Sequence, residues 1–402
     1  MSHQEQLYQW NQTLARHLPN LSKPQAHCLA LWTFGMVLAR SCSLSAVVSV
    51  LAALLGDKQD NLRQRLREFY KEAPHKAGEK RQTLNVEICF GSLLRWVLCW
   101  WHADQLALAL DATSLGDRFV VLTISVLYRG CAIPVAWCVT QAAQKRAWRC
   151  EWLRLLRLLA RAIPADKQVI VLADRGLYAR WLFGRIVRLG WHPLLRVNNN
   201  CTFSPASGGG YRPMSSFVST PGMRWSGRGV AFLERPQRLE CTLLAFYGEG
   251  HKDPWLLLTD LPPENAEVCW YGLRTWIEQG FKFLKRSGWQ WNHTRMSDPE
   301  RAARLWLATS VATLWLLSEA AAADPSMTEA TFGPLRLVNV CCRAATRLSR
   351  IGIFRAGWIC ILVHFLRHEP LPRPQLVPEP WPMHPPALRQ IKVNSAKQKV
   401  AA

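Results

Sequence analysis

The sequence has few acidic residues and lacks the short motifs that mark several common enzyme classes. Its 402 residues include 28 Asp and Glu against 50 Lys and Arg, which gives a formal net charge of +22. It contains no G-x-x-x-x-G-K-[ST], G-x-G-x-x-G or H-E-x-x-H sequence, so nucleotide hydrolysis, dinucleotide redox chemistry and zinc proteolysis lose their usual support. The excess of cations points instead to a polyanionic partner, either nucleic acid or an anionic membrane surface.

Cysteine pairs and long hydrophobic runs are also missing. The 13 Cys are irregularly spaced with no C-x-x-C pair, which disfavours a disulfide framework or a zinc site and suits a reducing cytosol. The two best apolar runs, 305–323 and 351–366, are short and carry polar residues such as Glu319 and Arg355, so we expect buried helices there and no membrane span. The first residues are polar and hold no apolar stretch, so no signal peptide is expected.

Periodicity predicts an all-helical N-terminal region followed by a mixed sheet. Two apolar helices, at 24–39 and 43–55, precede a basic helix at 59–70; this order is typical of a helix-turn-helix unit that contacts DNA, and also of a small helical bundle. From residue 104 the pattern predicts three strands, a helix, a strand, a helix and a strand, an order expected for a mixed α/β sheet covered on both faces. Gly and Pro punctuation between 198 and 266 predicts a small β insertion.

Two acids close apolar strand-like runs. Asp111 follows the run 106–110, and Asp174 follows the run 169–173. In open α/β sheets the carboxyl ends of the strands are where ligands bind. The alternative is that each Asp only caps the turn or helix that follows it, but two such strand ends in one sheet favour a site.

A third acid lies on the helix predicted at 268–286. At 100° per residue, Tyr271, Arg274, Glu278, Lys282 and Lys285 fall on one stripe, and apolar residues fall on the opposite side. One face of this helix is therefore expected in the core, while the other presents an acid flanked by cations. Ordinary pairing between residues four apart on a surface helix is the alternative interpretation.

Together, Asp111, Asp174 and Glu278 suit a pair of hard divalent ions. Oxygen ligands are those that Mg²⁺ prefers, and it needs only one or two carboxylates per ion. Two such ions about 3.5–4 Å apart can activate a nucleophile and stabilise the leaving oxygen of a phosphodiester. The net positive charge of the chain fits a substrate of that kind.

These residues resemble the DDE transposases of bacterial insertion sequences, specifically the insertion-sequence-four type. The signature of that family is Tyr, two residues, Arg, three residues, Glu, six residues and Lys, and Tyr271, Arg274, Glu278 and Lys285 satisfy all four positions. The sequences Leu-Asp-Ala-Thr at 110–113 and Ala-Asp-Arg-Gly at 173–176 resemble its two Asp motifs. The similarity covers roughly residues 104 to 320.

The resemblance implies a ribonuclease-H-like α/β core and a cut-and-paste mechanism. Asp111, Asp174 and Glu278 would bind two Mg²⁺ or Mn²⁺ ions, an activated water would cut at the transposon end, and the freed 3′-hydroxyl would attack target DNA. Relatives act as homodimers on paired ends of double-stranded DNA. A protein of this kind is expected in the bacterial cytoplasm, at the nucleoid and away from membranes.

The expected segments are a helical DNA-binding domain (1–104), the first part of the core (105–197), a β insertion (198–266), the last part of the core (267–322), a helical C-terminal region (323–368) and a Pro-rich basic tail (369–402).

The resemblance also implies DNA contacts outside the three acids. Trp255 begins a Trp-Leu-Leu-Leu-Thr stretch, and in relatives the Trp of such a stretch stacks on a flipped base of a DNA hairpin. The alternative is that Trp255 is a core residue, as we expect for most of the 20 Trp. Phosphate contacts near the cut are expected from five residues: Tyr271, Arg274, Lys285, Arg175 and Lys282.

Further basic stripes are expected to track the DNA backbone or to be solvated helix faces. They comprise Arg146, Arg149, Arg154, Arg157 and Arg161, and then Arg343, Arg347 and Arg350. Three alternatives to a transposase remain open: a metal-dependent nuclease on the same core, a DNA-binding protein that has lost catalysis, and a protein bound to a membrane surface.

Overall fold

The N-terminal hundred residues contain five α-helices, of which α1, α3 and α4 pack against the apolar helix α2. The structure is a computed structural model that describes residues 1–79, 81–144, 148–322 and 352–383. Ser2 and Ser22 each begin a helix with a capping box, in which the Ser hydroxyl accepts a backbone N–H and the third helical residue reaches back. The predicted helices at 24–39, 43–55 and 59–70 are confirmed. The five are α1 His3–His17, α2 Lys23–Ala39, α3 Leu44–Leu55, α4 Gln59–Tyr70 and α5 Glu87–Cys99.

The chain divides into two compact units, which are described separately. The first comprises Met1–Arg196 and Leu273–Pro380, and the second comprises Val197–Gly272 together with the chain from Trp381 onward.

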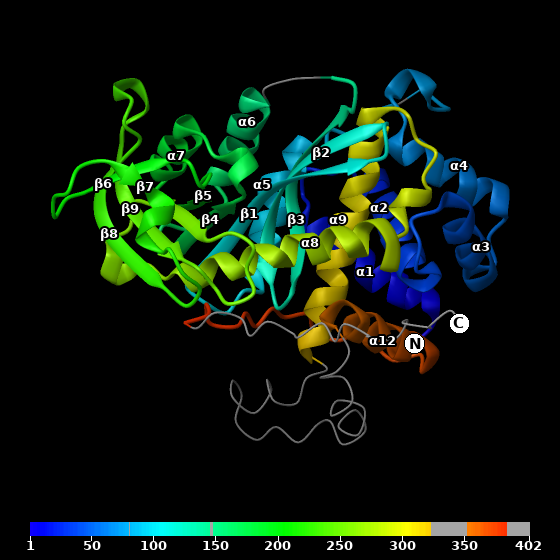
Figure 1. The fold of residues 1–402 in the computed structure, drawn as a ribbon. Coiled ribbons are helices and arrows are strands. Elements are labelled where there is room, and N and C mark those ends of the chain that lie inside the picture. The colour runs from blue at the N-terminus through cyan, green and yellow to red at the C-terminus, as the bar shows by residue number, and fades with distance from the viewer. Residues whose placement is uncertain (80, 145–147, 323–351, 384–402) are drawn as a thin grey trace, which may run out of the picture. The chain divides into compact units, whose positions relative to one another are not determined.

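The first unit contains the mixed sheet that the sequence predicted. The order of three strands, a helix, a strand, a helix and a strand is confirmed. Within the unit the strands lie in the order β3-β2-β1-β4-β5, with β1 to β3 antiparallel and β4 and β5 parallel to β1 (Figure 1). The elements are β1 Gln105–Leu115, β2 Phe119–Tyr128, β3 Cys131–Gln141, α6 Arg149–Ala160, β4 Gln168–Ala173, α7 Arg180–Val187 and β5 His192–Arg196.

The helix predicted at 268–286 is three helical segments of different pitch. A 3₁₀ segment, Val268–Arg274, leads into α8 Thr275–Lys282, and a π turn, Phe283–Ser287, follows. In α8, Gly280 faces β3 so closely that a Cβ atom there would lie 2.9 Å from the Ala132 Cβ. Glycine at this position is therefore what lets the helix backbone rest on the sheet.

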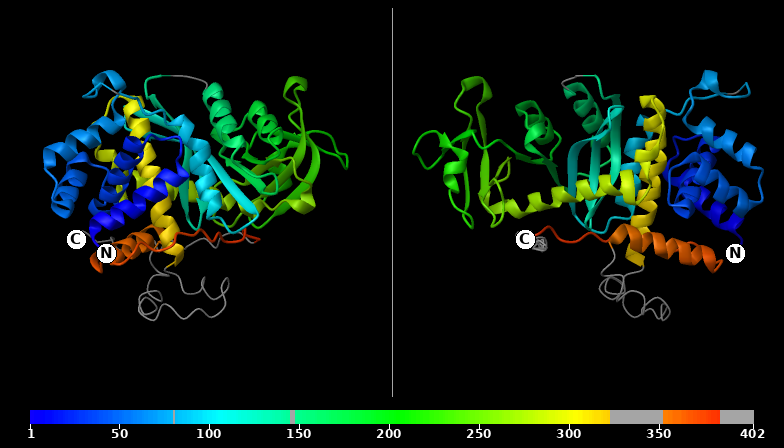
Figure 2. Two further views of the ribbon diagram at one scale, coloured as in Figure 1. Left: turned by 180° about the vertical axis from the view of Figure 1, so that it is seen from behind. Right: turned by 45° about the vertical axis from the view of Figure 1, so that its right-hand side comes forward.

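Helix α9, Pro299–Ala322, is the central buried helix of the first unit. It packs against β3 on one side and against α2, α4 and α12, Ile353–Leu366, on the others, and Figure 2 shows it standing between the sheet and the N-terminal helices. Its described residues from Leu305 to Ala320 are buried, which confirms the prediction of a buried helix in this run. Among the described residues, no single helix is long and apolar enough to cross a membrane, although α2 and α3, bent by 94°, pass that test of length and composition as a pair.

The Pro-rich segment after α12 takes more part in the fold than its composition predicts. Leu376 is fully buried and forms a single parallel bridge with Trp101. Its N–H donates to the Trp100 carbonyl at 2.8 Å, and the His102 N–H donates to the Leu376 carbonyl at 3.2 Å. A non-Pro position between prolines keeps its N–H donor, so Leu376 can form both backbone hydrogen bonds. The basic residues after 383, and the stripe at Arg343, Arg347 and Arg350, lie outside the described residues.

The second unit is an antiparallel sheet in the order β10-β9-β8-β6-β7. Gly229 in β8 lies against the Ser204 carbonyl of β6, where a Cβ would have no room. The strands of this unit all lie between Thr202 and Thr259, within the segment 198–266 where the sequence predicted β structure. The strands are β6 Thr202–Pro205, β7 Arg212–Pro213, β8 Arg224–Ala231, β9 Leu239–Phe246 and β10 Trp255–Thr259.

Glu319 of α9 should make the stability of the protein depend on pH. Complete burial raises the pKa of Glu319 well above its usual range, and a hydrogen bond from Trp315 Nε1 at 3.2 Å only partly opposes this. The folded state keeps the proton while the unfolded state loses it above its ordinary pKa, so the stability contributed by the neutral form is lost as the pH rises. Glu319→Gln keeps a side-chain oxygen that accepts from Trp315. We expect its free energy of unfolding to rise relative to that of the wild type by up to about 1.4 kcal/mol per pH unit between pH 5 and 7.

Chemical denaturation at several pH values measures this difference. The exposed Glu264→Gln serves as the matched control and should track the wild type throughout. A gap between Glu319→Gln and the wild type that stays constant with pH would contradict a neutral buried carboxyl.

Candidate active site

The register of the first sheet brings Asp111 and Asp174 onto neighbouring strands. Leu110 of β1 pairs with Ala173 of β4 in parallel register, so the next residue of each strand is the predicted acid. Asp174 ends its strand and caps the short 3₁₀ helix 175–177, its Oδ1 accepting the Arg175 N–H at 2.7 Å. Asp174 therefore caps a helix, as the alternative interpretation predicted, and it also lies at the carboxyl end of β4.

Asp111 lies inside its strand and not at the strand end. Strand β1 continues to Leu115, because β2 pairs with it beyond the point where β4 stops, and Asp111 stands opposite Thr123. The prediction that the strand closes at Asp111 is therefore wrong, although the parallel pairing with β4 does close there. Pairing with β2 fixes the backbone of Asp111, and its carboxylate is largely buried, with 18% of the side chain exposed.

Arg274 contacts all three predicted acids. Its Nη2 atom lies 3.0 Å from Asp111 Oδ2 and 3.6 Å from Asp174 Oδ2, and its Nη1 atom lies 2.8 Å from Glu278 Oε1. The guanidinium side chain is 12% exposed, whereas those of Asp174 and Glu278 are 38% and 53% exposed. Three carboxylates from β1, from the end of β4 and from α8 therefore meet at one cation.

The charge balance of this cluster depends on Arg274. Burial raises the pKa of Asp111, the nearby Arg274 guanidinium opposes that rise, and the Asp174 and Glu278 carboxylates add to it. The charged form of a buried acid next to two other acids is stabilised by a nearby cation and by hydrogen bonds, and Asp111 Oδ1 also accepts the Ala112 N–H at 2.8 Å. Arg274 is that cation in the structure.

The donor chemistry of the cluster fits a hard divalent ion, although the cluster is arranged around Arg274. Carboxylate oxygens are the ligands that Mg²⁺ and Mn²⁺ prefer, and three of them already share one positive charge. As placed here, no group of three or more His, Cys, Asp or Glu within the described part of the chain is arranged to hold a metal. Asp111, Asp174 and Glu278 are the residues that could do so.

The stripe predicted on the helix at 268–286 is interrupted at both ends. Glu278 and Lys282 of α8 are exposed, and Ile277, on the opposite side, is buried. Tyr271, in the 3₁₀ segment, is only 4% exposed, and Lys285 lies in the π turn, where it is half-buried and burial lowers its pKa. A constant 100° per residue fails here because 3₁₀ and π segments have different pitches.

The remaining predicted DNA contacts lie on surface positions of their own units. Arg175 is exposed on the 3₁₀ helix after Asp174. In the second unit, Trp255 is half-buried at the start of β10, and its ring lies 5.2 Å from that of Tyr271, edge to face, and 5.0 Å from that of His251. Trp255 thus belongs to an aromatic cluster without being fully enclosed.

Sequence reasoning missed Thr123 and Ser125 of β2. Both are buried, and neither hydroxyl has a hydrogen-bond partner among the described residues. Thr123 pairs directly with Asp111, and residues opposite each other in antiparallel strands present their side chains to the same face. Two hydroxyl residues at alternate positions of an apolar strand were the signal that could have identified this face.

The sequence of this chain was also compared with known protein families. Residues 150–315 match the family model described as the transposase DDE domain. The matched segment contains Asp174, Arg274 and Glu278 and begins after Asp111, and it covers less than half of the chain. A search of the curated proteins found no match. The chain therefore carries a segment similar to a transposase DDE domain, on a mixed α/β core that is compatible with such a domain.

A double-mutant cycle should show strong coupling between Arg274 and Asp111. Removing Arg274 leaves a largely buried carboxylate next to two others, so Arg274→Ala should destabilise the protein much less when Asp111→Asn is already present. We expect about 1–3 kcal/mol of coupling in the free energy of unfolding, measured by urea denaturation. The coupling of Arg274 with Glu278→Gln should be smaller, because that pair is more exposed.

The exposed Asp166→Asn provides the matched control for this cycle. It should couple with Arg274→Ala by less than about 0.5 kcal/mol, as expected for sites without shared contacts. Coupling between Arg274 and Asp111 no larger than in this control would show that their contact is not formed in solution.

Proposed function

We propose that this protein is a DNA transposase that cuts and rejoins DNA at the ends of a mobile element. The observation that carries the proposal is the meeting of Asp111, Asp174 and Glu278, from three separate elements, at one cation. The match to a transposase DDE domain supports it independently, and the net charge of +22 suits a DNA substrate. The insertion-sequence-four type and a cut-and-paste pathway are the finer parts of the proposal, and they rest on the four-residue signature that ends at Lys285.

Asp111, Asp174 and Glu278 would hold two Mg²⁺ or Mn²⁺ ions. Bound there, the ions would supply positive charge that activates the attacking water or 3′-hydroxyl and stabilises the leaving oxygen. The sheet fixes the backbone of Asp111, and α8 carries Glu278 toward it, so the acids are preorganised before DNA binds.

Arg274 would bind the three carboxylates in the protein alone and a DNA phosphate during the reaction. The same carboxylates can neutralise either its guanidinium or divalent ions, so the two compete for them. A guanidinium released from carboxylates is a bidentate ligand for a DNA phosphate. We propose that Arg274 turns from the acids to the scissile region of the DNA, and that Arg175, Lys282 and Lys285 add phosphate contacts.

The second unit would contact the transposon end. The partly exposed ring of Trp255, with Tyr271 beside it, offers an aromatic surface on which an unpaired base can stack. We propose that two copies of the protein act on paired DNA ends in the bacterial cytoplasm, with the helices of residues 1–104 as the main duplex-binding part.

Loss of any one of the three acids should abolish cleavage and spare DNA binding. Asp111→Asn, Asp174→Asn and Glu278→Gln keep the size of each side chain but remove a charged oxygen ligand, so we expect cleavage to fall about 100-fold or more. The substrate is a plasmid that carries the DNA flanking the coding region, incubated with Mg²⁺, and binding is followed by fluorescence anisotropy. Asp166→Asn is the matched control and should cleave as the wild type does.

The products of the same assay separate the alternatives. Cut ends joined to a second DNA molecule support a transposase, whereas cutting without joining identifies a nuclease on the same core. Binding without cutting identifies a DNA-binding protein that has lost catalysis. Full activity of Glu278→Gln would refute the assignment of Glu278.

A further inference from the structure

A large cavity in the first unit lies outside the three-carboxylate site and has no role in the chemistry described so far. Its volume is about 820 Å³. It is lined by the turn between α2 and α3 (Ser41 to Ala46), by the end of α4, by the segment 293–298, and by the first turns of α9. None of the three acids or the signature residues lines it.

The lining of this cavity is strongly cationic. Arg67 and Lys71 at the end of α4, Arg295 in the 293–298 segment and Arg301 of α9 all line it. Within the described residues, Arg67, Lys71 and Arg295 form no ion pair, whereas Arg301 pairs with Glu72 at 2.9 Å. The positive charge of these three side chains is therefore left for a ligand.

The acid in the lining is already used. Asp298 Oδ1 accepts the backbone N–H groups of Glu300 and Arg301 at 2.8 and 3.1 Å, which caps the start of α9. Its Oδ2 lies 3.7 Å from Arg301 Nε. The remaining polar lining consists largely of hydroxyl groups, which can donate to an anion: Ser41, Ser43, Ser45, Thr294 and Ser297.

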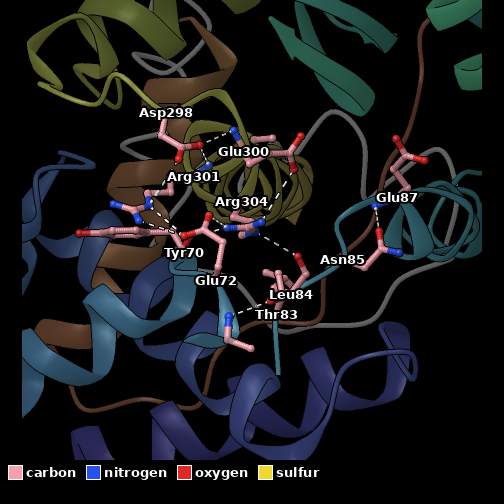
Figure 3. Close-up of polar contacts among 12 residues, drawn as sticks. Tyr70, Glu72, Thr83, Leu84, Asn85, Glu87, Asp298, Glu300, Arg301 and Arg304 are labelled. Carbon is pink, nitrogen blue, oxygen red and sulfur yellow. Dashed lines mark hydrogen bonds and ion pairs between the residues drawn. The ribbon is translucent and has the colours of Figure 1, made fainter. Parts of the chain in front are cut away.

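A buried ion network fixes one wall of the cavity. Figure 3 shows Glu72, which follows α4, between Arg301 and Arg304 of α9. Glu72 Oε1 accepts from Arg304 at 2.7 Å, and Arg304, which is 4% exposed, also donates to the carbonyls of Tyr70 and Leu84 at 2.7 and 3.1 Å. Burial opposes ionisation of Glu72, but the hydrogen bonds from Arg304 and Arg301 outweigh it and lower its pKa. The end of α4 is thus tied to α9.

One backbone and one side-chain hydrogen bond fix the other walls. The Cys42 N–H, in the turn between α2 and α3, donates to the Trp289 carbonyl at 2.8 Å. Arg118 of the β1–β2 turn donates to the Met296 carbonyl at 3.1 Å. The walls of the cavity are therefore held in place by these contacts, so a ligand that enters it orders the cationic side chains but not the backbone around them.

We propose that this cavity binds the phosphate backbone of double-stranded DNA. The proposal rests on the proposed function, and it adds a second DNA-binding site away from the reacting phosphates. Two guanidinium groups, one ammonium group and a row of hydroxyls are the donors that proteins use to contact DNA phosphates. A membrane surface is disfavoured because the ligand groups lie in a concavity, and none of the exposed large apolar side chains of the described residues lines it.

The test compares two triple variants that lose the same charge. Arg67→Gln, Lys71→Gln and Arg295→Gln together remove the cavity cations. Arg188→Gln, Arg367→Gln and Arg373→Gln remove three exposed cations that do not line the cavity. Binding of a fluorescent DNA duplex is measured by anisotropy between 50 and 200 mM salt.

The cavity variant should bind DNA with a much weaker dependence on salt. Each phosphate contact contributes about 0.9 to the slope of log K against log salt, so we expect the slope to flatten by roughly 2–3 in the cavity variant and by less than about 1 in the control variant. Thermal unfolding verifies that both variants fold. If the cavity variant does not fold, Arg295→Gln alone should flatten the slope by about 0.9.

Two results would overturn the inference without affecting the proposed function. One is an equal change of slope in both triple variants, which would show that the cavity cations affect DNA binding only through the net charge of the protein. The other is a thermal shift by inorganic phosphate that requires the cavity cations while duplex binding does not, which would identify a site for a small anion. Wild-type protein that shows no salt-dependent duplex binding would refute the proposed function as well.

Discussion

Like charges cannot be gathered in a partly buried place without a cation, and the first unit is organised around that constraint. Asp111, Asp174 and Glu278 come from a strand, a strand end and a helix, and each would repel the others if Arg274 were absent. The sheet, the 3₁₀ segment and α8 together deliver the guanidinium to the point where the three carboxylates meet. The same arrangement that keeps the acids together in the protein alone makes them available to divalent ions. Stability and proposed chemistry therefore depend on one set of charges.

Much of the fold and the three acids of the candidate site could be predicted from the sequence, because both follow from local patterns. Apolar runs with period two or 3.6 identified the strands and helices of the first unit, and acids directly after two of these runs identified Asp111 and Asp174. The pattern could not give the length of β1, because pairing with β2 extends it past Asp111 and pairing is a tertiary property. Nor could it give the pitch of residues 268–287, where a 3₁₀ segment and a π turn displace Tyr271 and Lys285 from the expected stripe. That Arg274 would contact all three acids required the geometry of three elements at once.

Helix α9 connects the two functions that we propose for the first unit. One side of it packs on β3 of the sheet that holds the acids, and its first turns line the cationic cavity. Arg304, which sequence reasoning passed over, is the buried residue that joins this helix to the end of α4. An exposed salt bridge contributes little to stability, whereas a buried Arg with three acceptors fixes geometry. The cavity thus has rigid walls although its ligand groups are long, flexible side chains.

The contact between Gly280 and Ala132 sets the depth at which α8 rests on the sheet. Glu278 is two residues earlier on that helix, so the close packing of Gly280 on Ala132 also limits how near the third acid can come to the sheet that carries Asp111. Any larger residue at position 280 would act as a spacer between the helix and β3. The smallest residue of α8 therefore sets the spacing between the helix that carries Glu278 and the sheet that carries Asp111.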